Sequence, residues 1–363
     1  MSATTISFKS KDKKNFAKEM KGEVHNYFTE NNISKHADGQ MILKTIVLLS
    51  LYFGAYGLVL SGWFGLAGMA LLCFCMGIGM AGIGFSVSHD ALHGAYSSNK
   101  TVNKLLGYTF DLMGANGYIW KITHNIIHHT YTNIYEHDED LEVAEFIRLS
   151  PNAEFKRVHR AQHILAFIAY GFATLFWVFV KDYKYFFQST LGPYENKSHP
   201  ASEWITLFIT KVLYYGYMLV LPYILLPITW WQLGIGFLII HFTAGVILGI
   251  IFQLAHVVEG PDHPTENEEG NIENAWIIHQ METTSNFAHK NKPLCWYIGG
   301  LNYQIEHHLF PKICSVHYPQ ISLIVQRVAK KYNVPYHYQE TLTVAVKSHY
   351  HTLKKFGNPD QQE

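Results

Sequence analysis

The sequence predicts an all-α integral membrane protein with four transmembrane helices, one interfacial helix and a helical cap on the cytoplasmic side. Three observations predict this fold class. Of the 363 residues, 48% are hydrophobic and only 15% are charged, whereas about 25% of the residues in a typical globular domain are charged. Several apolar runs are each long enough to cross about 30 Å of hydrocarbon. Three histidine clusters lie at or near the ends of these runs.

The N-terminal part of the chain predicts a basic arm followed by a helical hairpin. Residues 1–40 form a lysine-rich arm with helical character around Asn15–Phe28, and the membrane domain occupies 41–363. Two spans are expected at about 41–60 and 63–87, joined by a short uncharged turn. The second run is rich in small residues, which favour close helix packing. Because basic segments stay on the cytoplasmic side, the arm is expected there.

The middle of the chain contains one apolar run that we do not assign as a span. Residues 161–180 are apolar, but they include scattered Tyr, Phe and His and have charged flanks, which is typical of an interfacial helix. Clearer spans follow at about 205–227 and 231–255. If the three histidine clusters build one site, an even number of spans must separate them. This parity predicts four spans, with the cytoplasmic cap formed by 88–204 and 256–363, including a helix near Val316–Asn333.

The histidine clusters have the spacing of metal ligands. Residues four apart share one face of a helix, so each H-x₃-H pair is expected to offer two imidazoles to one point, while adjacent histidines reach two different metals. A single such pair is weak evidence, but three histidine clusters together predict a metal centre, and imidazole suits iron. The clusters are His89-x₃-His93, His124-x₃-His128-His129 and Gln304-x₂-His307-His308.

The charge balance argues against a nucleic-acid-binding protein, and the cysteine content argues against a disulfide framework or a cysteine-based metal site. The 28 basic and 28 acidic residues balance, so the chain lacks the excess of basic residues that is typical of nucleic-acid-binding proteins. The four cysteines form neither a CxxC pair nor a disulfide framework. These observations leave a membrane protein with a histidine-rich metal site.

The three clusters, their order and their placement around paired spans resemble the membrane fatty-acyl desaturase superfamily. The segment Gly-Gly-Leu-Asn-Tyr-Gln-Ile-Glu-His-His-Leu-Phe-Pro at 299–311 is similar to that of front-end (delta-5 and delta-6 type) acyl desaturases. The resemblance runs from about Asn15 to the C-terminus. It implies an oxidoreductase with two iron ions that uses O₂ and two electrons to introduce a cis double bond into an acyl chain. In front-end enzymes the new bond lies on the carboxyl side of an existing one.

The resemblance also implies a ligand set. A further histidine is expected at the inner end of the fourth span, where His256 lies, although His279 is a competitor. Gln304 stands where relatives have another histidine, and its side-chain oxygen is expected to bind iron or to hold a water. The implied metal ligands are His89, His93, His124, His128, His129, His256, Gln304, His307 and His308.

Several polar residues near the clusters are candidates for orienting the ligands or contacting the substrate. Acidic residues can accept hydrogen bonds from ligand imidazoles, or they can form an ordinary solvated face. Trp120 is expected either to meet an acyl head group or to anchor the membrane interface. The amide and hydroxyl candidates either line the site or are loop residues. The candidates are Asp90, Trp120, Asp138, Asp140, Gln280, Thr283 and Asn286.

The expected partners are the lipid bilayer, an acyl-CoA or acyl-lipid substrate and a separate electron donor of ferredoxin or cytochrome b5 type. A separate donor is expected because the sequence lacks a His-Pro-Gly-Gly haem motif and the arm has no room for a fused cytochrome b5 domain. The active site and both termini are expected on the cytoplasmic side of a bacterial inner membrane or the ER. The alternatives are a related di-iron hydroxylase, a sphingolipid desaturase or a non-catalytic metal- or haem-binding protein. A transporter would place ionisable residues at mid-membrane.

Overall fold

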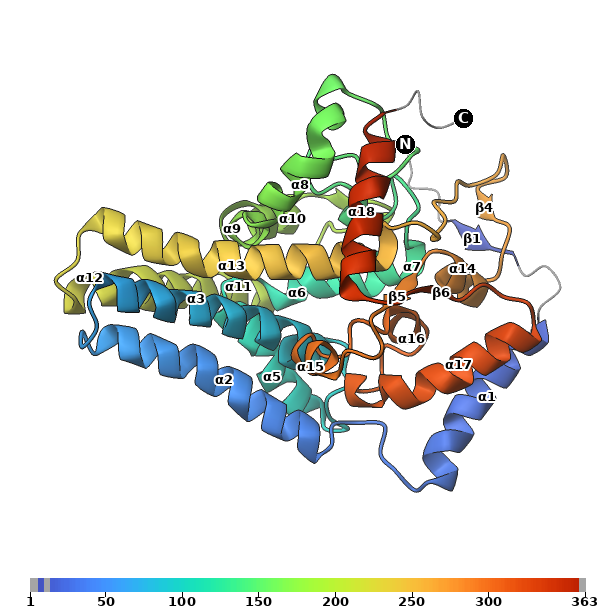
Figure 1. The fold of residues 1–363 in the computed structure, drawn as a ribbon, viewed down its shortest axis with the longest axis horizontal. Helices are drawn as coiled ribbons and strands as arrows, with labels where there is room; N and C mark the ends of the chain where they lie inside the picture. The colour runs from blue at the N-terminus through green and yellow to red at the C-terminus, as the bar shows by residue number, and fades with distance from the viewer. Residues whose placement is uncertain (1–5, 10–13, 359–363) are drawn as a thin grey trace.

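The computed structural model describes residues 6–9 and 14–358, and it shows a bundle of long helices joined end-on to a helical cap (Figure 1). Four helical stretches are long and apolar enough to cross a membrane, as the sequence predicted, so the protein is a multi-pass membrane protein. The second stretch comprises α3 (Leu66–Ile83), a π-helical turn and α4 (His89–Leu92). The third comprises α11 (Ala201–Tyr215), a π-helical turn and α12 (Leu221–Leu225). The four stretches are α2 (Gly39–Leu60), Leu66–Leu92, Ala201–Leu225 and α13 (Trp230–His256).

Small residues let the spans approach closely, as their composition predicted. A Cβ atom on Gly77 would lie 2.6 Å from the Cβ of Thr243 in α13, and one on Gly79 would lie 3.1 Å from Tyr52 in α2. Helix starts are fixed by side-chain caps, since Asp38 accepts a hydrogen bond from the N–H of Met41 at the start of α2. The bundle therefore has α3 packed between α2 and α13.

The apolar run expected as one interfacial helix is divided in two. Arg157–Tyr170 and Ala173–Phe187 are helical segments that meet at an angle of 70°. The bend follows Gly171, where a Cβ atom would lie 2.2 Å from the ring of Phe242 in α13. Close contact with α13 thus breaks the helix at a glycine, and its placement at the membrane interface stays a prediction.

The remaining helices and three short sheets form the cap and the connections to it. The helices are α1 (Lys14–Glu30), α3 (Leu66–Ile83), α4 (His89–Leu92), α5 (Lys100–Leu112), α6 (Gly117–Trp120), α7 (His129–Tyr131), α8 (Gln162–Tyr170), α9 (Ala173–Phe176), α10 (Asp182–Phe187), α11 (Ala201–Tyr215), α12 (Leu221–Leu225), α14 (Trp276–Glu282), α15 (Lys292–Tyr297), α16 (Gln304–Leu309), α17 (Tyr318–Lys331) and α18 (Leu342–Phe356). The two-stranded sheets pair β1 (Ser7–Phe8) with β4 (Asn271–Ile272), β2 (Thr190–Leu191) with β3 (Tyr194–Glu195), and β5 (Ser285–Phe287) with β6 (His337–Gln339). Pairing is parallel in the first and last sheets and antiparallel in the second.

The N-terminal segment packs onto the cap. Its amphipathic region forms α1, whose buried Phe16 and Met20 share a core with Ile321 and Val325 of α17. The two helices lie side by side at the end of the molecule farthest from the bundle (Figure 1). Helix α18, which the sequence analysis did not anticipate, crosses α8 and the inner end of α13.

Candidate metal centre

The three histidine clusters converge where the bundle meets the cap. The first cluster begins at α4, directly after the π-helical turn Gly84–Ser88 that extends α3. The second has His124 and His128 on the π-helical segment Lys121–His128, which continues α6, and His129 at the start of α7. The side chain of Asn116 accepts a hydrogen bond from the N–H of Ile119 and so fixes the start of that helix. The third cluster lies on α16, whose six residues are all buried.

The ring nitrogens of six of these histidines, together with that of His256, form two compact groups. Within each group the facing nitrogens all lie within 4.8 Å of one another, and every residue is buried. The doublet His307–His308 is shared between the two groups, as expected for adjacent residues on a helix. The first histidine group is His89, His93, His124 and His307, and the second histidine group is His128, His256 and His308.

His124 and His128 take part in more than one group. They were expected to point to one site, and together with Asp140 they form a third group whose ligand atoms lie within 4.8 Å of one another. His124 also belongs to the first histidine group and His128 to the second. Their rings are stacked with centroids 5.2 Å apart. Both rings are also near the half-exposed carboxylate of Asp140, at 3.9 Å from His124 and 3.7 Å from His128.

The other candidate ligands take different positions. His129 lies between the groups, with its Nε2 3.3 Å from that of His124 and its ring centroid 4.4 Å from that of His308. His256 ends α13 within the second histidine group, whereas the ring of His279 packs against Phe8 and joins neither group. Gln304 is buried at the start of α16, and its amide nitrogen has no hydrogen-bond partner among the described residues.

The Nδ1 atoms of the second histidine group are held by polar partners. His128 Nδ1 lies 3.0 and 3.1 Å from the two carboxylate oxygens of Asp138. His308 Nδ1 lies 2.7 Å from the amide oxygen of Gln280. The carbonyl oxygen of Thr283 lies 3.1 Å from His256 Nδ1. Such contacts fix the tautomer and the orientation of each ring, leaving Nε2 to face the group.

The first histidine group is supported by three further residues. Trp120 stacks on His124 with ring centroids 4.4 Å apart, so this tryptophan is part of the site. One carboxylate oxygen of Asp90 lies 3.6 Å from His89 Nδ1. The hydroxyl of Tyr318 lies 3.2 Å from His307 Nδ1.

Asn286 supports the third cluster indirectly. Its side-chain oxygen accepts a hydrogen bond from the N–H of Ile305, and its nitrogen donates to the carboxylate of Glu306 at 2.7 Å. Burial raises the pKa of Glu306 to about 7, although hydrogen bonds from Asn286 and Tyr336 oppose the shift. Asn286 therefore fixes α16 without touching a histidine ring of that helix.

The residues present fit a metal centre. The ring nitrogens His93 Nε2, His307 Nε2 and His308 Nε2 are buried without a hydrogen-bond partner among the described residues, a costly state unless a ligand completes them. Burial and neighbouring histidines lower the pKa values of His124, His129, His307 and His308, which favours the neutral imidazole that binds metals. For His128, burial disfavours protonation of the imidazole, but the negative charge and the hydrogen bonds of Asp138 outweigh this effect and raise its pKa.

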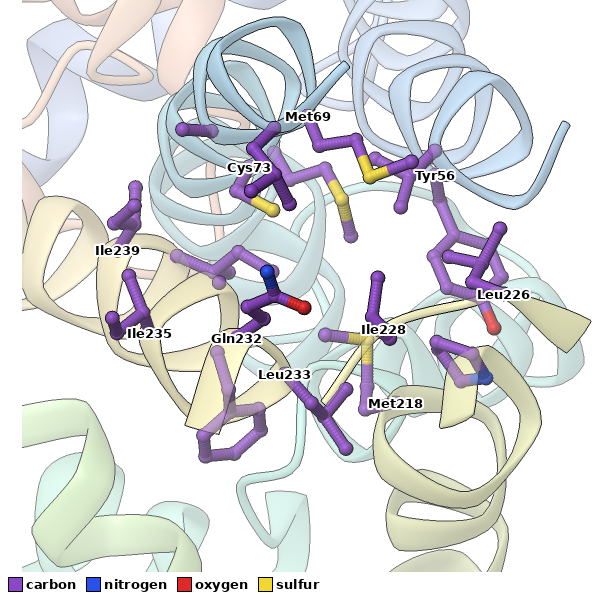
Figure 2. A pocket seen from close by; sticks show the side chains of 18 of the residues that line it. Tyr56, Met69, Cys73, Met218, Leu226, Ile228, Gln232, Leu233, Ile235 and Ile239 are labelled. Atoms are coloured by element: carbon purple, nitrogen blue, oxygen red, sulfur yellow. The ribbon is translucent and has the colours of Figure 1, made fainter. Parts of the chain in front are cut away.

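A separate apolar cavity of about 260 Å³ lies between the spans, and Figure 2 shows its lining side chains. Val59, Leu66, Leu226 and Ile228 place it beside the two connections between spans, at the ends of α3 and α13 opposite to His89 and His256. It is therefore not the place where the histidines act.

Comparison with known proteins decides the family. A model of the fatty acid desaturase family matches residues 61–340. The sn-1 linoleoyl-lipid 6-desaturase of Arthrospira platensis is 36% identical over 353 residues, covering 95% of this chain and 94% of that protein. The same-named protein of Synechocystis sp. is 34% identical over 98% of this chain and 99% of its own. The acyl-lipid (8-3)-desaturase of Physcomitrium patens is 32% identical over 97% of this chain and 74% of its own.

The chain belongs to the fatty acid desaturase family. It is therefore an oxidoreductase that introduces a double bond into a fatty acyl chain, and its four spans place it in the bilayer with its lipid substrate. The expectation of a desaturase, drawn from the three clusters, is confirmed.

Three residues of this desaturase support the site without having been predicted from the sequence. Asn133 donates hydrogen bonds to the carbonyl oxygens of His256 and Thr283, tying the second cluster to the end of α13. Its φ of 60° is one that asparagine tolerates, which is the only local signal for it. His349 of α18 lies 2.7 Å from the carbonyl oxygen of Val257. Tyr318 has no distinguishing sequence signal.

Proposed function

We propose that the protein is a di-iron, O₂-dependent acyl-lipid desaturase that adds a cis double bond on the carboxyl side of an existing one. The observation that carries this proposal is the pair of histidine groups, buried side by side with unpartnered ring nitrogens. Two groups that share the second and third clusters suit two metal ions. Relatives named as 6-desaturases of an already unsaturated linoleoyl chain support the position of the new bond.

The two groups divide the proposed ligands. The first histidine group would hold one iron and the second histidine group the other, with His129 between them. Gln304, one helical turn before His308, faces the same side of α16 and would complete the set. When bound, iron supplies the O₂ chemistry that oxidises an unactivated methylene pair.

The chain contributes orientation and the exclusion of water. Asp138, Gln280 and the carbonyl of Thr283 bind the Nδ1 side of their histidines and hold the Nε2 side toward the metal. Burial of every ring keeps bulk water from the reacting carbons, which limits side reactions of a strong oxidant.

We further propose the orientation and the electron supply. The active site and both termini lie on the cytoplasmic side, which the lysine-rich N-terminal segment supports. Electrons come from a separate carrier of ferredoxin or cytochrome b5 type. We also propose that residues 1–40 form a cytoplasmic arm and 41–363 the membrane desaturase domain, with α1 of the arm packed on α17 of the cap.

The position of the new bond requires a polar anchor. One methylene changes binding in an apolar pocket by only about 1–3 kcal/mol, so an apolar tunnel alone does not fix the register of an acyl chain. A head group held at the membrane surface does fix it, and the enzyme then counts from the carboxyl end.

Expression in a desaturase-poor host tests this function. Gas chromatography and mass spectrometry of total fatty acids should show a new double bond at a constant carbon number from the carboxyl as fed chains are lengthened, and the purified enzyme should contain two irons. A bond that keeps its distance from the methyl end instead would contradict the front-end assignment. A hydroxylated product would favour the related di-iron hydroxylases.

A further inference from the structure

A basic groove of about 910 Å³ opens on the cap beside the third histidine cluster. One wall is α1 and the segment that leads from it to α2, and the other is the loop that directly follows α16. We define the basic groove by Lys21, His25, Phe28, Lys35, Phe310 and Lys312.

The groove carries positive charge that has no acidic partner among residues 6–9 and 14–358. Lys21, Lys35 and Lys312 are exposed, and no Asp or Glu is among the lining residues. None of the three lysines has a carboxylate within ion-pair distance in the described part of the chain. The groove therefore offers an unpaired cationic surface.

Helix α1 separates its charges by face. Glu19 and Glu23, four residues apart, turn toward α17 and pair there with Lys331 and Arg327. Lys21 and His25 share the other face with Phe28, which lines the groove. The acidic face of α1 is thus used to dock the helix, and the basic face is left for a partner.

One wall of the groove is formed by residues that follow the proposed metal ligands His307 and His308 directly in the sequence. Phe310, which lines it, follows His308 by two residues, so their Cα atoms are at most about 7.6 Å apart. Half-buried Phe28 and Phe310 and exposed Ile33 provide an apolar floor between the lysines. An apolar centre with a charged rim is the usual anatomy of a protein–protein interface.

The reaction requires a partner at such a place. Converting R–CH₂–CH₂–R′ to R–CH=CH–R′ releases two electrons and two protons, whereas reducing O₂ to two waters takes four of each. The balance is R–CH₂–CH₂–R′ + O₂ + 2 e⁻ + 2 H⁺ → R–CH=CH–R′ + 2 H₂O, so an external reductant must supply two electrons per turnover.

We propose that the basic groove is the docking surface for a small one-electron carrier protein with an acidic face. This inference rests on the proposed function, because only an O₂-dependent desaturase needs the carrier. Charge complementarity selects the partner and speeds encounter, and the apolar floor holds it beside α16. Electrons then enter next to His307 and His308.

Charge reversal in full-length enzyme in phosphatidylcholine nanodiscs tests the groove. The rates at which reduced [2Fe–2S] ferredoxin and reduced soluble cytochrome b5 are oxidised by the enzyme without O₂ are measured by stopped flow at several salt concentrations. Lys21→Glu/Lys312→Glu should lower the second-order rate constant with the accepted carrier by about tenfold or more at low salt. The loss should shrink as salt screens the charges. Lys21→Arg/Lys312→Arg should keep the wild-type rate.

The matched control reverses two exposed lysines elsewhere on the cap. Lys347→Glu/Lys354→Glu on α18 should leave the carrier rate at the wild-type value. An unchanged rate in the groove variant, or an equal loss in the control, overturns the proposal. The proposal is also overturned if the groove variant no longer co-purifies with phosphatidylglycerol but still oxidises the carrier at the wild-type rate. That result would identify the groove as a site for a lipid head group.

A second measurement separates this proposal from the proposed function. Enzyme reduced with dithionite and then exposed to O₂ needs no carrier, so the groove variant should form wild-type amounts of single-turnover product. Loss of that product in the groove variant would mean a damaged site and would overturn the docking role. Failure of the wild-type enzyme itself would contradict the O₂-dependent desaturase and not the groove.

Discussion

The carboxylate of Asp90 accepts a hydrogen bond from the backbone N–H of Ser315, 3.0 Å away across 225 positions of the sequence. The same oxygen accepts a bond from the Ser315 hydroxyl at 2.9 Å, and the other oxygen faces His89 Nδ1. One fully buried acidic side chain therefore ties the first histidine cluster to the loop that follows the third. Asp90 thus lies inside the protein as a connection between two clusters, whereas Asp140 beside the second cluster is half-exposed.

Replacing a histidine of either group should remove a metal ligand. His128→Ala is expected to lower the iron content of the purified protein and to abolish product formation, because a buried site is left with an open position. Iron is measured by mass spectrometry and product by gas chromatography. His351→Ala, at an exposed position on α18, should change neither quantity. Near-normal product from His128→Ala would refute the ligand assignment.

Asp138→Asn should weaken iron binding while leaving the fold intact. Loss of a partner that orients a ligand typically lowers metal affinity by about 10–100-fold, and Asp138 contacts His128 through both oxygens. The iron retained against increasing chelator concentration measures the effect. Asp140→Asn is the control, since that half-exposed carboxylate lies 3.7 Å from His128 and should matter less. Equal losses in the two variants would show that orientation by Asp138 is not the cause.

Breaking the ion pair between α11 and α10 should destabilise the protein. Lys211 lies 2.7 Å from Asp182, and both side chains are almost completely buried. Lys211→Met leaves an unpaired buried carboxylate, which costs about 3–5 kcal/mol and should lower the thermal unfolding midpoint in detergent. Lys211→Met/Asp182→Leu should recover most of the loss. A double variant no more stable than the single one would show that packing, not charge, sets the cost.

Acid should loosen the contact between α1 and α17. Hydrogen bonds from Lys331 and Tyr332 lower the pKa of Glu19, so its stabilising contribution is present above the ordinary value of 4.5 and declines as pH falls below it. A spin label at Thr29 should become more mobile in that acidic range. Glu19→Gln should be mobile already at neutral pH, and Glu30→Gln should behave as the wild type. Mobility that rises with acid in Glu19→Gln as well would assign the effect to another group.

Cysteine labelling should show all three clusters on one side of the membrane. Reagents applied outside intact cells should reach cysteines substituted for the exposed Ser61 and Thr229, which connect the spans. They should miss substitutions of Lys121 and Lys312, which lie near the second and third clusters. External labelling at Lys312 with protection at Lys121 would separate the clusters and exclude a single site.

The spans and the clusters were predictable because each depends on local composition or spacing. An apolar run of sufficient length has few alternatives, and histidines at the inner ends of such runs must meet if the spans pair. The π-helical segment that carries His124 and His128 was not predictable, because the sequence pattern does not distinguish it from an α-helix. The break at Gly171 depends on the ring of Phe242, which is distant in the sequence. The position of His256 at the end of the fourth span favoured it over His279, but only the tertiary fold places His256 in a histidine group and the ring of His279 against Phe8.

The order in which the histidines occur along the chain constrains the biogenesis of the enzyme. Each histidine group requires one member of the doublet His307–His308, so neither is complete in a nascent chain that has not yet passed α16. All four spans precede that point and can enter the bilayer while both groups still lack their last member. Metal held by both groups as proposed would therefore find its complete set of histidines only after all four spans have been synthesised. A chain arrested before its last sixty residues would be inserted in the membrane but inactive.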